Sequence, residues 1–221
     1  MANPLKLLAL SGALLVLPAA ANAAILVSSS NYGLAAPAGP GVLIDFDSPL
    51  PGSFNPISGS GYGIFNGDVP GQAAAPADGP TDASDDTTDY LAVFGGSATL
   101  LGNVGYSNVS LYWGSIDTYN ALDLLDSFGV VFGTVDASAI GSGGNGNQLS
   151  TNTNRRVDIA STAPIYGLRF RSTGAAFETD NVKFFNAVPE PTTWAMMIVG
   201  FGFVGSAMRR RRAVPNREVL A

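Results

Sequence analysis

Any chemistry in this chain has to come from carboxylates, from a lone serine or lysine, or from aromatic rings, because its 221 residues include no histidine and no cysteine. Histidine-based triads, cysteine nucleophiles and zinc sites built on imidazole or thiolate are therefore excluded. Glycan hydrolysis needs only two carboxylates at a set separation, one of them with a raised pKa. The candidates for that pair are Asp117, Asp123 and Glu178. Glutamate is scarce and these acids lie near expected strand turns, so we favour a non-enzymatic protein and assign no catalytic residue.

Acidic residues also gather in two places where oxygen ligands could hold Ca²⁺. The first is residues 70–89, whose acids match no EF-hand spacing and fit a solvated acidic loop better. The second is Glu178-Thr179-Asp180-Asn181, which we place at a strand turn in preference to a cation site. We expect no cofactor unless calcium binds here, and its candidate ligands are Asp82, Asp85, Asp86, Glu178 and Asp180.

Three aromatic residues are candidate glycan contacts. Tyr112, Trp113 and Tyr119 would stack on sugar rings if their side chains are exposed. A tryptophan at the end of a strand more often belongs to the core, and that is the interpretation we prefer for Trp113.

The body of the chain is strongly acidic. Between Ala24 and Val188 the sequence has fifteen acidic and five basic residues, which leaves a charge near −10. Because phosphate binding needs a basic face, nucleic acid is not expected as a partner. The acidic balance fits solubility outside the cell.

Glycine and proline punctuate this region, and β-branched and aromatic residues cluster between them, which is typical of an all-β fold. Val109, Leu111 and Trp113 alternate with Ser110 and Tyr112, and one-sided burial of this kind indicates an antiparallel β-sandwich. The expected strands are Val42–Phe46, Tyr90–Phe94, Val109–Trp113, Ala121–Leu125, Val130–Val135, Arg155–Ile159, Tyr166–Arg171 and Asn181–Phe185.

The connections between these strands differ in kind. Asp126–Gly129 is expected to be a hairpin turn, with a short helix over 120–127 as the alternative. Residues 70–89 have almost no apolar bulk and are too long for a hairpin, so we expect an exposed, flexible acidic loop there. The segment Gly141–Gly146 lacks the Lys-Ser/Thr ending of a phosphate-binding loop and is expected to be a flexible hairpin loop.

The first 23 residues have the three parts of a secretory signal peptide. Lys6 supplies the positive charge, Leu7–Leu17 the apolar stretch, and Ala21-Asn22-Ala23 the small residues of a cleavage site. A short buried helix is the alternative. We predict export by the Sec machinery and cleavage between Ala23 and Ala24.

The other end reads as a membrane segment followed by positive charges. Trp194 to Met208 contains no charged residue, and a helix over this stretch spans roughly 22 Å, less than the ~30 Å hydrocarbon core. The arginines that follow would hold the far end in the cytoplasm and leave the body outside the inner membrane. By composition alone, a permanent single-span anchor fits as well.

The residues before the apolar segment narrow this choice. Pro-Glu-Pro, then Trp-Ala, the apolar stretch and the terminal arginines together resemble the PEP-CTERM sorting signal, in its PEP-x-x-W-A variant. The resemblance implies recognition by exosortase, a membrane transpeptidase of the cysteine type, and cutting near Pro-Glu-Pro. Similar tails carry an ice-binding protein C-terminal label, but Thr151-Asn152-Thr153 alone does not make the repeats of an ice-binding face. The motif residues are Pro189, Glu190, Pro191, Trp194, Ala195, Arg209, Arg210, Arg211 and Arg212.

Within the body, Ser110–Asn120 and Ser172–Val182 resemble the core of other exosortase-dependent surface proteins and of jelly-roll carbohydrate-binding modules. We therefore predict a jelly-roll-like antiparallel β-sandwich. The expected division is a signal peptide at 1–23, the sandwich at 24–187, a sorting segment at 188–212 with one transmembrane helix at 194–208, and a cytoplasmic tail at 213–221.

These observations favour an exported protein of a Gram-negative bacterium. It would pass through an inner-membrane intermediate, be cut by exosortase, and reach the cell surface or extracellular (biofilm) matrix, with extracellular polysaccharide as a candidate partner. The alternatives are a glycan-cleaving hydrolase that uses paired carboxylates, a permanently membrane-anchored structural protein, and a matrix component without glycan affinity.

Overall fold

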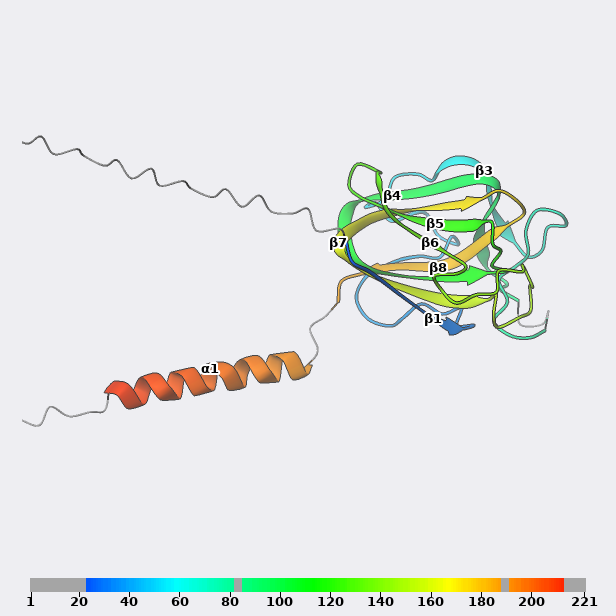
Figure 1. Cartoon of the computed structure of the whole chain (residues 1–221). Coiled ribbons are helices and arrows are strands. Elements are labelled where there is room, and N and C mark those ends of the chain that lie inside the picture. Colours follow the sequence, from blue (N-terminus) through cyan, green and yellow to red (C-terminus); the bar gives the residue numbers. More distant parts are fainter. Residues whose placement is uncertain (1–22, 82–84, 188–190, 213–221) are drawn as a thin grey trace, which may run out of the picture.

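The computed structural model describes residues 23–81, 85–187 and 191–212. Within these residues a β-rich body is followed by a single helix (Figure 1). The elements are β1 Ile25–Asn31, β2 Val42–Ile44, β3 Ser58–Asn66, β4 Asp89–Gly114, β5 Asn120–Leu125, β6 Val131–Asp136, β7 Arg155–Ser172, β8 Phe177–Phe185 and α1 Pro191–Arg212.

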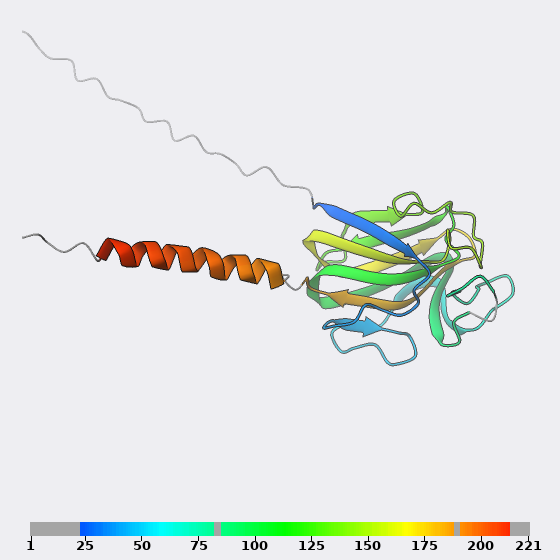
Figure 2. The ribbon, with the colours of Figure 1, turned by 90° about the horizontal axis from the view of Figure 1, so that it is seen from below.

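Two long strands, β4 and β7, are shared between two antiparallel layers. The first half of β4 pairs with β3 and with the second half of β7, which continues to β5 and β6. The second half of β4 pairs with β8 and with the first half of β7, and these continue to β2 and β1. The pairing register of β4 shifts between Leu101 and Tyr106, where the strand curves from one layer to the other (Figures 1 and 2). The arrangement is consistent with the predicted all-β sandwich.

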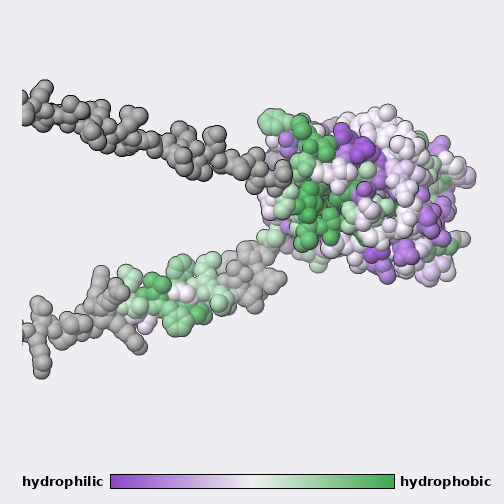
Figure 3. Space-filling model, viewed as in Figure 1, coloured by the Kyte–Doolittle hydropathy of each residue, from purple (hydrophilic) through white to green (hydrophobic). Residues whose placement is uncertain are grey.

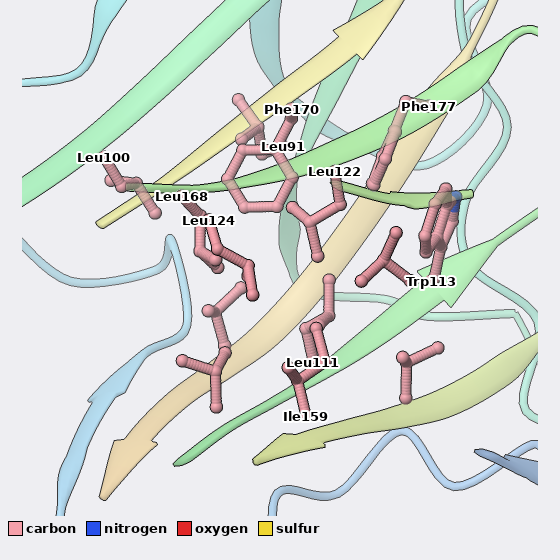
Figure 4. Close-up of a cluster of buried hydrophobic side chains, with 14 of the residues drawn as sticks. Leu91, Leu100, Leu111, Trp113, Leu122, Leu124, Ile159, Leu168, Phe170 and Phe177 are labelled. Atoms are coloured by element: carbon pink, nitrogen blue, oxygen red, sulfur yellow. The ribbon is translucent and has the colours of Figure 1, made fainter. Parts of the chain in front are cut away.

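The core lies between these layers (Figure 4). Trp113 from β4 stacks on Phe177 from β8 with ring centroids 4.2 Å apart, and Phe170 from β7 meets Phe177 edge-on at 5.4 Å. The predicted inward face of Val109, Leu111 and Trp113 is confirmed, because all three are fully buried. Burial of these large apolar side chains supplies the main stabilisation in a chain without disulfides.

Every expected strand overlaps an observed one, but the boundaries differ. The two segments 90–94 and 109–113 belong to one continuous strand, β4, and 155–159 and 166–171 both belong to β7. β1 and β3 were not predicted. β3 is rich in glycine because its backbone lies unusually close to β4: a Cβ on Gly59 would be 2.0 Å from the Ser97 carbonyl oxygen.

The hairpin predicted at Asp126–Gly129 is confirmed, and the helix alternative over 120–127 is wrong. β5 and β6 pair antiparallel, and the amide of Asp126 donates to the Val130 carbonyl at 3.0 Å. The Asp126 carboxylate closes the turn by accepting hydrogen bonds from the amides of Phe128 and Val130.

The prediction of an exposed loop at 70–89 is wrong for its first part. Ala74, Ala75 and Ala77 are buried. Ala77 accepts a hydrogen bond from the Tyr112 hydroxyl, so this stretch covers the outer face of β4. Alanine and proline can pack closely against a sheet without any bulky side chain, and low apolar bulk therefore did not indicate exposure here. Residues 82–84 lie outside the described residues.

Candidate functional site

The connections 67–88 and 137–154 gather at one end of the body, which we call the loop end (Figures 1 and 2). β8 begins at this end, where Glu178 pairs with Gly114 at the end of β4. The first and last residues of the body meet at the opposite end, the tail end, where Ala24 and Ala187 line the same hollow. A nine-residue strand spans roughly 27 Å, and this length of β8 separates the two ends.

A hollow of about 270 Å³ opens at the loop end and is lined by three acids, Asp68, Asp117 and Glu178. The Glu178 side chain is buried, its Oε1 accepts the Ala74 amide at 3.1 Å, and its Oε2 accepts the Ser115 hydroxyl. Burial raises the pKa of Glu178 to about 7, although these two hydrogen bonds act in the opposite direction. Glu178 therefore lies in β8 and not at a strand turn, and the fold brings it together with Asp117.

Asp123, the third candidate for a hydrolytic pair, does not line this hollow. It is buried in β5, and Arg169 and Arg171 each reach its carboxylate at 2.7 Å, while Thr134 donates to Oδ1 at 2.8 Å. Burial opposes ionisation, but the hydrogen bonds from Arg171, Thr134 and Arg169 prevail and hold the pKa of Asp123 below its usual value. We call this buried carboxylate between two arginines the Asp123 clasp. Its role is structural, and the assignment of Asp123 to a catalytic pair is wrong because it does not line the hollow.

The structure separates the three aromatic candidates. Tyr112 and Trp113 have no exposed surface, so both are wrong as glycan contacts. Trp113 lies in the core, as preferred, and Tyr112 lies under the cover formed by residues 74–77. Tyr119 is 37% exposed, and its hydroxyl donates at 2.7 Å to the carbonyl of Ala175, which lines the hollow. It remains a candidate contact beside the acidic hollow.

The proposed calcium ligands fall into separate places. Among the described residues, no three acidic side chains converge on one point. Glu178 faces the acidic hollow, whereas Asp86 and Asp180 lie beside each other, and Asp85 lines a neighbouring hollow with Asp86. Burial together with Asp86 raises the pKa of Asp180 to about 8. Asp180 also lies within β8 and not at a turn, and Asp82 is outside the described residues.

Sequence reasoning missed two residues that shape this end. Ser115 holds Glu178 and has a left-handed backbone, φ 35°; the Gly-Ser pair directly after a strand was the available signal. Arg156 is nearly fully buried and donates to the carbonyls of Gly33, Leu34 and Asn181. Nothing in the pattern of the sequence distinguishes it from the half-buried Arg155 that precedes it.

At the tail end, α1 begins at Pro191, where a proline suits the first helical position because its missing N–H needs no partner. The described apolar side chains of α1, among them Met196 and Phe203, are exposed (Figure 3). Arg209 is exposed as well. Residues 1–22, with Ala21 of the predicted cleavage site, and Pro189 and Glu190 lie outside the described residues, as do the side chains of Pro191, Trp194, Ala195, Arg210, Arg211 and Arg212.

Within the part of the chain that the structure describes, no helix is both long and apolar enough to cross a membrane. The predicted transmembrane helix at 194–208 falls inside α1 but is not confirmed as a span.

Comparison with known families identifies the tail. Residues 187–212 match the PEP-CTERM protein-sorting motif. The chain carries a PEP-CTERM sorting signal. The predicted resemblance is thereby confirmed, and the motif implies export, exosortase processing and sorting to the surface of a Gram-negative bacterium.

The other comparisons add little to this. No curated protein sequence matches the chain. Among solved structures, the K2 cleaved adhesin domain of Lys-gingipain is similar at 14% identity and a TM-score of 0.25, over 64% of this chain and 96% of that domain.

Proposed function

We propose that this chain is an exported surface protein that passes through an inner-membrane intermediate and is released by exosortase to the cell surface or extracellular matrix. The match of residues 187–212 to the PEP-CTERM motif is the observation that carries the proposal. The N-terminal signal at 1–23 would supply the entry to the Sec pathway.

The character of α1 supports a membrane step. The described apolar side chains of α1 are exposed, and a large exposed apolar surface marks a site that contacts a membrane or another protein. The uncharged stretch 194–208 spans roughly 22 Å, which is less than the ~30 Å hydrocarbon core. Such a short segment suits temporary retention better than a permanent anchor.

Mass spectrometry of the mature C-terminus tests this proposal. We expect the envelope and medium forms of the parent chain to end near Pro189–Pro191, and the Glu190→Ala variant to keep Arg212. Glu218→Ala, which removes a carboxylate beyond the motif, is the matched control and should be processed like the parent. A parent chain that retains Arg212 in every fraction would favour the permanent anchor and overturn the proposal.

We further propose that the body is non-enzymatic and associates with extracellular polysaccharide through the loop end. The hollow supplies carboxylates that can accept hydrogen bonds from sugar hydroxyls, and Tyr119 beside it offers a ring for stacking. The loop end is also the end farther from the sorting signal, since Ala187 lies at the tail end.

Retention on insoluble polysaccharide, measured by co-sedimentation, tests the glycan proposal. Tyr119→Ala should lower retention by about tenfold, since loss of one stacked ring costs roughly 1–1.5 kcal/mol. Tyr166→Ala is the control, because Tyr166 is half-buried near the tail end. Equal retention of both variants and the parent would remove Tyr119 from the site.

One observation favours the hydrolase as a second candidate. Glu178 and Asp117 line the same hollow, and a carboxyl whose pKa is about 7 can act as a general acid near neutral pH. A hydrolase should release reducing ends and lose that activity in Glu178→Gln and in Asp117→Asn. A binding protein should keep its affinity for polysaccharide in Asp117→Asn and show no turnover in the parent chain.

A further inference from the structure

Two buried carboxylates that the sorting signal does not involve meet between the 67–88 connection and β8. Asp180 is fully buried and Asp86 nearly so. Each uses one oxygen for neutral donors: Oδ2 of Asp180 accepts the Asn181 side-chain amide at 2.7 Å, and Oδ1 of Asp86 accepts the Thr88 amide at 2.9 Å and the Thr88 hydroxyl. The other oxygens, Oδ1 of Asp180 and Oδ2 of Asp86, are buried without any hydrogen-bond partner.

The two carboxyl groups lie close enough for Asp86 to raise the pKa of Asp180. Ionised carboxylates only accept hydrogen bonds, so nothing in the pair itself can satisfy both oxygens. Asp47, in the connection after β2, adds a third negative charge that acts on Asp180. Burying like charges against each other is unfavourable unless a proton or a cation lies between them.

The basic side chains nearby do not fill that role. Arg156 interacts with Asp180 at longer range, but it donates its hydrogen bonds to the backbone carbonyls of Gly33, Leu34 and Asn181. Lys183 likewise donates to the carbonyls of Pro37 and Gly39. Both cations therefore tie down the segment 33–39 and leave the carboxylate pair without a direct charged partner.

We propose that Asp86 and Asp180 together bind a Ca²⁺ ion that joins the 67–88 connection to β8. Calcium takes about six to eight oxygen ligands, of which two carboxylates can supply up to four, while backbone carbonyls and water complete the set. The hollow lined by Asp86 and Asn181 gives the ion a route from solvent. An all-oxygen site suits Ca²⁺ better than zinc, which prefers nitrogen and sulfur ligands.

The ion would fix the cover of the β4 face. The Asp86 amide donates to the Pro76 carbonyl at 2.8 Å, one residue before Ala77, which receives the Tyr112 hydroxyl. An ion held at Asp86 and Asp180 therefore fastens this cover to the sheet. Without the ion, a proton shared by the two carboxyls would have to hold them together, because the pKa of Asp180 is raised to about 8.

Calorimetry and thermal unfolding of the purified full chain in mild detergent, stripped with EDTA and held at pH 7.5, test the proposal. We expect titration with CaCl₂ to show one site per chain. A calcium concentration of tenfold the Kd should raise Tm by about 3–6 °C. Protease should cut the 67–88 connection more slowly when calcium is present. Asp180→Asn and Asp86→Asn should each lose the binding heat and the Tm rise. Asp126→Asn, at a half-buried turn acid whose replacement amide oxygen can still close the turn, should keep both.

The competing account is a single shared proton between the two carboxyls. In that case the parent chain gives no binding heat and no Tm change at 10 mM CaCl₂, and the proposal is overturned. Calcium binding that survives unchanged in both Asp→Asn variants, with each variant folded by circular dichroism, overturns the assigned ligands. The parent measurement decides between ion and proton even if a variant fails to fold.

Discussion

Replacing Asp123 by asparagine should be among the most destabilising single changes of charge in the body. The carboxylate is 1% exposed and accepts four hydrogen bonds from two guanidinium groups, with a fifth from Thr134. Breaking a buried pair costs about 3–5 kcal/mol, but Arg169 and Arg171 are 36% and 44% exposed and can turn toward water. We therefore expect a loss of about 2–4 kcal/mol in the free energy of unfolding at pH 7.

Urea denaturation of Asp123→Asn and of the parent chain, at pH 7 and at pH 3, measures this loss. Because the pKa of Asp123 is lowered in the folded state, its contribution is present above the unfolded value near 4 and disappears as the pH falls through the folded pKa. The difference between the two chains should thus shrink at pH 3. Asp136→Asn, an exposed acid that accepts from Ser138 and Ala139, should cost less than about 1 kcal/mol. If the unfolding free energy of Asp123→Asn at pH 7 lies within about 0.5 kcal/mol of the parent value, a difference no larger than typical error, the clasp is refuted.

Three further changes have expected outcomes. Trp113→Ala should cost about 3–5 kcal/mol in denaturant unfolding, because it leaves a cavity against Phe177; a loss below 1 kcal/mol would mean that the ring is not in the core. Tyr112→Phe removes the hydroxyl that reaches Ala77, and should cost about 1–2 kcal/mol and speed proteolysis of the 67–88 connection, whereas unchanged cutting would contradict the cover. Because the pKa of Glu178 is raised to about 7, the folded parent binds more protons than the unfolded chain, so its stability falls as pH rises from about 4.5 to 7. Glu178→Gln should show a smaller fall, since Asp180 with its raised pKa still contributes, and parallel pH profiles would count against this reasoning.

The sequence predicted the fold class and the buried face of its strands better than the number and boundaries of the strands. Alternation identified Val109, Leu111 and Trp113 as one inward face, because side-chain direction has a period of two in any strand. It did not reveal that the predicted strands 90–94 and 109–113 are one strand, β4. The residues where β4 bends, between Leu101 and Tyr106, have the composition of an ordinary loop. β3 was not predicted because its glycines suggest a loop. They are needed where the backbone of β4 lies close, and only the strand pairing shows this.

The sites divide in the same way. The sorting signal is local in sequence, so the order of its parts was enough to find it. The acidic hollow and the Asp86–Asp180 pair are assembled from residues about a hundred positions apart, and their partners depend on how the 67–88 connection folds back. Asp123 is an example of a contact that local sequence cannot predict. Its arginine partners lie on the neighbouring strand β7, and the residues around position 123 give no sign of them.

The position of β8 has a mechanical consequence. It runs from the loop end to the tail end between β2 and β4, and its last residue leads toward the sorting signal. A force applied between the tail and a partner held at the loop end would act along this strand, so that many of its interstrand hydrogen bonds resist sliding at once. β1 also runs between the two ends, but it pairs only with β7, so a pull on its first residue is resisted by one line of pairing instead of two. The body should therefore resist traction through its C-terminal side far better than through its N-terminal strand.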